Sequence, residues 1–462
     1  MTTITIPTPG RSRGLARVAG LGLAALIVLL ATRLPAATPA PRPAPAADQP
    51  APDAVVPAPA LDARGTLGLL PPAQRVAFWE KRVAAGGSYL DLINLADAYL
   101  DRSRISGGLD DLTRAAAALD RAARTAPYPS QVSVRRAQVA FALHDFTGAM
   151  RRADRVLRDE PTNLAALGVA ADSRLELGDV TGAGQRYRQL AQLAPSPAAW
   201  SRLGRLSFLT GDPDAAIPLV SRAAVVSRQE GAPDAEAFYE FQLGDMQRTT
   251  GDLAAAGAAY ERALVALPDY VPAMAGLAAV RNAQGNRDAA ISLLETATAR
   301  LPQPELVAAL GDLYALAGRT ADAQAQYRLV DGIAQLSAAT GSVYDRQLDI
   351  FAADHDRGVA AAVRRARGEL AVRRDVYGHD ALAWALFKAG DLAEASREAT
   401  AALALGTPDP RLAYHAALIF EAGGGAARAL PLIRLAVRGI ALLPPLQQPL
   451  ARAALSRLEG EQ

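Results

Sequence analysis

The sequence contains no cysteine, only four histidines, two lysines (Lys81 and Lys388) and 5% aromatic residues. Without cysteine the chain can form no disulfide, no thiolate nucleophile and no cysteine-ligated zinc site. It also has no H-E-x-x-H, G-x-x-x-x-G-K-[ST] or G-x-G-x-x-G sequence. His379 and His415 could approach one another, but hydrogen-bonded structural histidines are the expected outcome. We therefore predict no catalytic residue, no cofactor, no metal and no small-molecule substrate.

Neither sign of charge dominates, because 49 basic and 47 acidic residues give a formal net charge of +2. Arginines gather within residues 135–155 and 364–374, but acidic residues lie among them and aromatic residues for base stacking are scarce. We expect solvated outer helix faces in both places and no nucleic-acid binding. Contact with a membrane surface or an acidic partner is the alternative.

Residues 18–31 form an uncharged apolar run, preceded by Arg11, Arg13 and Arg17. We assign residues 1–34 to a signal peptide or an N-terminal signal-anchor helix. The run is shorter than the ~20 residues of a comfortable membrane span, which favours a cleaved signal. The nearby alanines are poorly placed for cleavage, which favours an anchor, and a buried structural helix is a third possibility. The positive-inside rule then predicts that the bulk of the chain lies at the extracytoplasmic face of the cell membrane, or is secreted.

Residues 35–64 are rich in proline and alanine and offer almost nothing to bury. Such a segment is expected to be a disordered, extended spacer, although a proline-rich stretch can also be a ligand for an aromatic groove. Residues 65–88 follow as a predicted capping helix.

A glycine followed by a small polar or charged residue recurs along the rest of the chain at intervals of about one helical hairpin. These glycines are Gly178, Gly211, Gly251, Gly285, Gly318 and Gly390. The last interval is double the others, so one irregular unit should turn near residues 354–356. Each glycine would end a helix in the left-handed conformation.

An alanine follows each turn glycine by four or five residues, and it would sit where the second helix crosses the first too closely for a larger side chain. The alanines in phase are Ala149, Ala183, Ala216, Ala256, Ala290, Ala323, Ala395 and Ala429. Seven residues before several turn glycines lies another small residue, such as Gly204, Gly244 or Gly311. A large side chain four residues beyond the alanine, such as Tyr260, would fill that space.

These positions resemble the tetratricopeptide repeat (TPR), which has W-x2-L-G-x2-Y in its first helix and A-x3-F…A…P in its second. Trp200 and Leu203-Gly204 match the opening of the first helix, and Ala256, Tyr260, Ala263 and Pro268 match the second. The resemblance extends to envelope-anchored or secreted bacterial TPR proteins. It implies an all-α, right-handed superhelical solenoid of about nine or ten hairpins, and a concave groove for a protein or peptide partner.

The units divide into a TPR array at residues 89–339, an irregular helical hairpin at 340–375, and a C-terminal TPR array with a cap at 376–462. The unit that opens at Trp200 has about six extra residues around 228–234. The lysines and asparagines with which some TPR proteins clamp a C-terminal carboxylate are absent, since Ser201, Arg205, Phe241 and Asp245 are among the residues at those positions.

Asp380, Trp384 and Phe387 lie at i, i+4 and i+7, on one stripe of a predicted helix, and Tyr414 opens the following unit. Exposed aromatic residues are typical interface anchors, so we predict that these four residues bind the partner. The alternative is that they pack against the irregular unit before them or the capping helix after them.

The sequence as a whole predicts a non-catalytic scaffold for protein–protein interaction at the bacterial cell envelope, held to the membrane through the N-terminal apolar segment. The alternative is an accessory subunit of an envelope enzyme complex whose site is shared with its partner.

Overall fold

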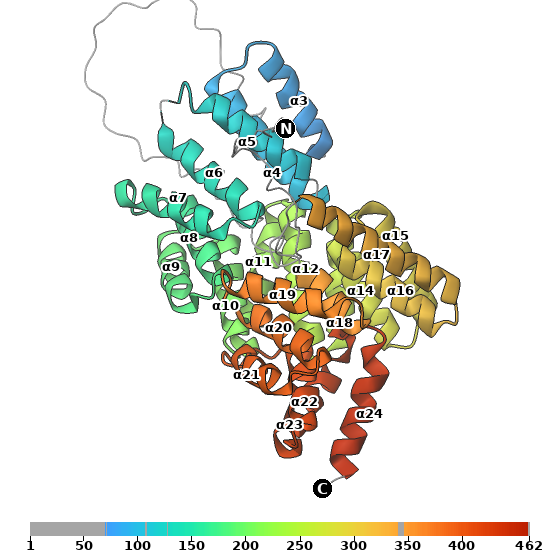
Figure 1. The fold of residues 1–462 in the computed structure, drawn as a ribbon. Coiled ribbons are helices and arrows are strands. Elements are labelled where there is room, and N and C mark those ends of the chain that lie inside the picture. Colours follow the sequence, from blue (N-terminus) through green and yellow to red (C-terminus); the bar gives the residue numbers. More distant parts are fainter. Residues whose placement is uncertain (1–69, 71, 107–108, 127, 341–345, 461–462) are drawn as a thin grey trace, which may run out of the picture.

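The computed structural model describes residues 70, 72–106, 109–126, 128–340 and 346–460, and these contain 22 α-helices and no strand. Twenty of the helices form ten consecutive hairpins (Figure 1). The hairpins are α4 (Tyr89–Ser106) with α5 (Leu109–Ala122), α6 (Pro129–Ala142) with α7 (Phe146–Asp159), α8 (Leu164–Glu176) with α9 (Val180–Leu193), α10 (Pro197–Leu209) with α11 (Pro213–Gln229), α12 (Pro233–Thr250) with α13 (Leu253–Ala266), α14 (Val271–Ala283) with α15 (Arg287–Arg300), α16 (Pro304–Leu316) with α17 (Thr320–Thr340), α18 (Arg346–Asp354) with α19 (Val359–Leu370), α20 (Val376–Lys388) with α21 (Leu392–Ala402), and α22 (Pro410–Ala422) with α23 (Ala426–Arg438). Helix α3 (Pro72–Ala84) precedes them, and η2 (Ile440–Leu442) and α24 (Gln447–Gly460) follow.

The turn glycines adopt the left-handed conformation that the sequence predicts, as Gly178 and Gly251 show with φ of 88° and 89°. The residue after each of these two glycines caps the next helix: the Asp179 carboxylate accepts a hydrogen bond from the Gly182 amide at 2.8 Å. Glycine therefore ends one helix and aspartate begins the next within two residues.

The irregular unit turns where the spacing predicts, because α18 ends at Asp354 and Asp356 takes a left-handed φ of 52° in place of a glycine. Its helices are short, at 9 and 12 residues. The extra residues around 228–234 are absorbed differently, since they lengthen α11 to 17 residues and α12 to 18.

Close helix crossings are made by the small residues of the repeat, as predicted. The eight phased alanines are all 2% exposed or less. A Cβ atom added at Gly244 would lie 2.6 Å from the ring of Tyr260, and one at Gly311 would lie 2.6 Å from the ring of Tyr327. Each ring also donates a hydrogen bond across its hairpin: the Tyr260 hydroxyl bonds to Asp245 at 2.6 Å and that of Tyr327 to Asp312 at 2.9 Å.

The solenoid curves until its C-terminal quarter lies against units in the middle of the chain, where the orange and red helices lie beside green ones (Figure 1). We call this contact the seam. Three turn glycines make it, because a Cβ added at Gly178, Gly211 or Gly251 would lie 2.5 to 2.9 Å from a carbonyl oxygen at residue 374, 406 or 438. The Thr407 hydroxyl also donates to the Leu209 carbonyl at 2.6 Å. Units about 200 residues apart in sequence are thereby neighbours.

The N-terminal segments predicted at 1–34 and 35–64 lie outside the described residues. Among the helices that the structure does describe, none combines the length and the apolar character needed to cross a membrane.

Candidate partner-binding groove

First helices of five hairpins face one another across the seam and enclose a cavity of about 290 Å³, which we call the groove pocket. Helices α10 and α12 form one wall, and α18, α20 and α22 form the other. The lining side chains include Arg205, Phe208, Leu209, Gln242, Asp245, Met246, Arg248, Arg346, Ile350, Tyr377, Asp380, Asp409, Arg411, Leu412 and His415. Because first helices line the concave side of a TPR solenoid, this pocket is part of its groove.

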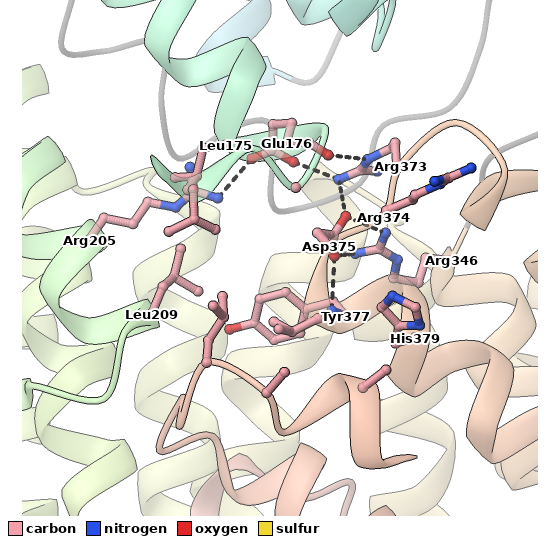
Figure 2. Close-up of a pocket in the computed structure, with 16 residues that line it drawn as sticks. Leu175, Glu176, Arg205, Leu209, Arg346, Arg373, Arg374, Asp375, Tyr377 and His379 are labelled. Atoms are coloured by element: carbon pink, nitrogen blue, oxygen red, sulfur yellow. Dashed lines mark hydrogen bonds and ion pairs between the residues drawn. The ribbon is translucent and has the colours of Figure 1, made fainter. Parts of the chain in front are cut away.

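A second cavity of about 240 Å³, the seam pocket, adjoins the first and shares Arg205, Leu209, Arg346 and Tyr377 with it (Figure 2). Its polar wall holds an ion network. The Glu176 carboxylate lies 2.7 Å from the Arg205 guanidinium and 2.6 Å from that of Arg373. Figure 2 shows Glu176 between these two arginines, one from each side of the seam.

Arg346 extends the network on the C-terminal side of the seam. Its Nη2 lies 2.5 Å from Glu369 and 3.0 Å from Asp375, and Arg373 reaches Glu369 at 3.2 Å. Burial alone would raise the pKa of Glu176, but the guanidinium groups of Arg205 and Arg373 hold it below its ordinary value. The Glu176 carboxylate is therefore ionised, and the network holds Arg205 and Arg346 in fixed positions on the pocket wall.

Helix α22 brings a second arginine pair to the groove pocket. Asp409 is 2% exposed and accepts bonds from Arg411 Nη2 at 2.7 Å, from its Nε at 3.1 Å and from its backbone amide at 2.8 Å. The Arg411 side chain is itself 49% exposed. Asp409 thus acts both as the N-terminal cap of α22 and as the anchor of an arginine that solvent can reach.

His379 and His415 have structural hydrogen-bond partners, as the sequence analysis expects. His415 Nδ1 lies 3.0 Å from both carboxylate oxygens of Asp380, and His379 Nδ1 lies 2.7 Å from Glu398. Burial alone would lower the pKa of His415, but the bonded Asp380 carboxylate raises it above its ordinary value. This pair joins α20 to α22 and forms part of the groove pocket wall.

The expected exposure of the aromatic stripe is wrong. Trp384 is 4% exposed and Tyr414 1%, while Phe387 is partly buried. The Trp384 ring stacks on His415 at 4.2 Å and 12°, and its Nε1 donates to Asp354 of the irregular unit at 2.7 Å.

The stripe is buried because the neighbouring hairpins cover it, so the alternative of packing against the irregular unit holds. Asp380 is 5% exposed but does line the groove pocket, whereas Trp384, Phe387 and Tyr414 do not. Partner binding by these four residues stays a prediction.

The arginine clusters at 135–155 and 364–374 are largely paired with acidic residues, as expected for solvated faces. Arg135 lies 2.8 Å from Asp97, and Arg365 lies 2.6 Å from Asp349. Arg373 departs from the expectation, because it is buried at the seam with Glu176.

Sequence reasoning missed most of the groove pocket. Arg205 and Asp245 were noted as groove positions only because they replace the residues of the carboxylate clamp. Arg346, Arg411 and Gln242 carry no motif, and what brings them together is contact between units that are far apart in the sequence. The Asp-Pro pair at 409–410, a cap followed by a helix start, was the available signal for a fixed arginine at 411.

Stacked helical hairpins with a groove between their first helices define a helical-repeat protein. Comparison with sequence families matches the tetratricopeptide repeat at residues 134–196, 169–236 and 248–313. These matches support a tetratricopeptide-repeat protein, with repeats identified over residues 134–236 and 248–313. No curated protein matches it.

Several solved structures are similar to parts of the chain. A MamA protein is 23% identical over 37% of this chain and 91% of its own, with a TM-score of 0.29. PilW, described as a widely conserved type IV pilus biogenesis factor, is 22% identical over 48% of this chain and 98% of its own, with a TM-score of 0.37. The human IFIT1 dimer with m7Gppp-AAAA is 13% identical over 75% of this chain and 81% of its own, with a TM-score of 0.44.

Proposed function

We propose that this protein is a non-catalytic scaffold that binds a protein or peptide partner in its groove at the bacterial cell envelope. The observation that carries the proposal is the groove pocket, which combines apolar side chains with fixed charged groups on facing first helices. Protein-binding surfaces combine an apolar centre with oriented polar groups in this way. A cavity of this size would hold one or two side chains of a partner whose remaining length follows the groove.

The envelope location rests on the sequence, through the apolar run at 18–31 with its preceding arginines. We propose that this segment anchors the repeats at the extracytoplasmic face, or is cleaved to release them.

Site-specific photocrosslinking tests the proposed function. A benzophenone amino acid would replace Phe208 or Ile350 in the groove pocket, and, as a matched control, Val265, which is 84% exposed on the second helix α13. Irradiation of cells should give one adduct shared by the two groove positions and absent from position 265. An adduct found equally at position 265, or none from the groove, would contradict the proposal.

A further inference from the structure

Each of the three carboxylates in the groove pocket wall already has a partner within the chain. Asp409 accepts three bonds from Arg411, and both oxygens of Asp380 accept from His415. Asp245, whose side chain is 31% exposed, pairs with Arg248 at 2.8 Å and accepts from the Tyr260 hydroxyl. Each wall carboxylate thus has a donor within the chain before any partner arrives.

Three side chains of the pocket lining keep donor nitrogens that have no acceptor among the described residues. Arg411 uses Nε and Nη2 on Asp409, and its Nη1 has no partner among the described residues. His415 uses Nδ1 on Asp380, which leaves Nε2. Gln242 accepts from the Ser201 hydroxyl through Oε1 at 2.6 Å, which leaves its amide nitrogen as a further donor. A ligand that matches this wall must supply acceptors.

Arg411 and His415 lie one turn apart on α22, so their free nitrogens belong to one face of one helix. Gln242 belongs to α12 on the opposite wall. Apolar side chains lie in the pocket around these donors, namely Phe208, Met246, Ile350 and Leu412. The lining therefore pairs charge-assisted donors with an apolar surface.

We propose that the groove pocket binds an acidic side chain of the partner, with Arg411, His415 and Gln242 as its donors, and that an apolar residue beside it packs on Phe208, Met246 and Ile350. This inference rests on the proposed function and specifies the partner's chemistry. A carboxylate fits better than a backbone carbonyl, because two of the three donors are cationic or become so on protonation.

The proposal includes a dependence on pH through His415. The charged groups that face its ring are Asp380 on α20, Asp354 on α18 and Arg411 on α22. Because the pKa of His415 is raised, Nε2 carries a proton below that pKa and becomes a neutral acceptor above it. Binding of an acidic group should therefore weaken as the pH rises through the folded pKa of His415.

Two fluorescein-labelled peptides of equal length test the inference, one with a central Leu-Glu-Leu and the other with Leu-Gln-Leu. Fluorescence polarisation with the purified full-length protein should show about tenfold tighter binding of the glutamate peptide at pH 6. The preference should shrink at pH 8, and it should also shrink in His415→Asn, which keeps a donor for Asp380.

Arg411→Lys should abolish most of the preference for the glutamate peptide. A single ammonium cannot reproduce the planar guanidinium, which bonds to Asp409 on one side and offers Nη1 to the ligand on the other. The matched control is Arg428→Lys, because Arg428 lies on the outer helix α23 and stacks over Phe420 at 3.7 Å. Equal binding of the two peptides by the unsubstituted protein would overturn the inference. Groove adducts without a preference for glutamate would overturn this inference alone, whereas absence of groove adducts would overturn the proposed function.

Discussion

The carboxylate of Asp354 should make the C-terminal units less stable at neutral pH than at mildly acidic pH. Its Oδ1 accepts hydrogen bonds from Trp384 Nε1 and Gln447 Nε2, each at 2.7 Å, and so joins α18 to α20 and α24. Burial raises the pKa of Asp354 from 3.8 to about 6, although His415 and the Trp384 bond act in the opposite direction. Between pH 3.8 and about pH 6, Asp354 holds a proton in the folded chain that it has released in the unfolded chain. The free energy of unfolding therefore falls as the pH rises through this range.

The size of the effect follows from that pKa change. The full change corresponds to about 3 kcal/mol, and because part of the carboxylate still reaches solvent we expect about 2 kcal/mol. Asp354→Asn keeps an oxygen that can accept both hydrogen bonds but carries no charge. The variant should gain about 2 kcal/mol over the unsubstituted protein between pH 4 and pH 7.

Urea unfolding followed by Trp384 fluorescence measures this gain, with Trp79 and Trp200 replaced by phenylalanine so that one reporter remains. Asp269→Asn is the control, because that side chain is 71% exposed and its removal should change the free energy of unfolding by less than about 0.5 kcal/mol. If the advantage of Asp354→Asn were the same at pH 4 and pH 7, the reasoning from burial would be refuted.

Three further predictions concern the seam, the aromatic stripe and the location. Gly178→Ala and Gly285→Ala should each lower the free energy of unfolding by about 1 kcal/mol because both glycines are left-handed. Only Gly178→Ala should also expose seam amides to hydrogen exchange. A Cβ at residue 178 would lie 2.5 Å from the Arg374 carbonyl, whereas nothing lies within 4 Å of a Cβ at residue 285. Equal exchange in the two variants would contradict the seam. Trp384→Ala combined with Tyr414→Ala should lower the free energy of unfolding by about 3 kcal/mol or more, and unchanged thermal melting would argue against their burial. Protease added to spheroplasts should digest the repeats, and their survival would refute the proposed location.

The periodic features of the fold could be predicted from the sequence because they depend on contacts within one hairpin. A left-handed glycine at the turn and an alanine at the helix crossing are local requirements that recur in most units. The turn at Asp356 could be predicted from the repeat period alone, although the residue in the left-handed conformation there is not glycine. Stacking of neighbouring units then follows, because a single hairpin cannot bury its own apolar face.

The groove pocket and the fate of the aromatic stripe were decided by the tertiary structure. A small rotation between each unit and the next accumulates until Glu176 meets Arg373 and the groove closes, yet no residue pattern marks that pair as partners. Helical spacing likewise predicts that the Trp384 side chain points away from its own hairpin. It does not predict whether that side chain faces the open groove or a neighbouring unit. The sequence by itself determined the repeat and its turns, because those depend on neighbours within about forty residues. The curvature of the whole solenoid determined which distant side chains form the site, because it is the sum of many packing angles that no single repeat records.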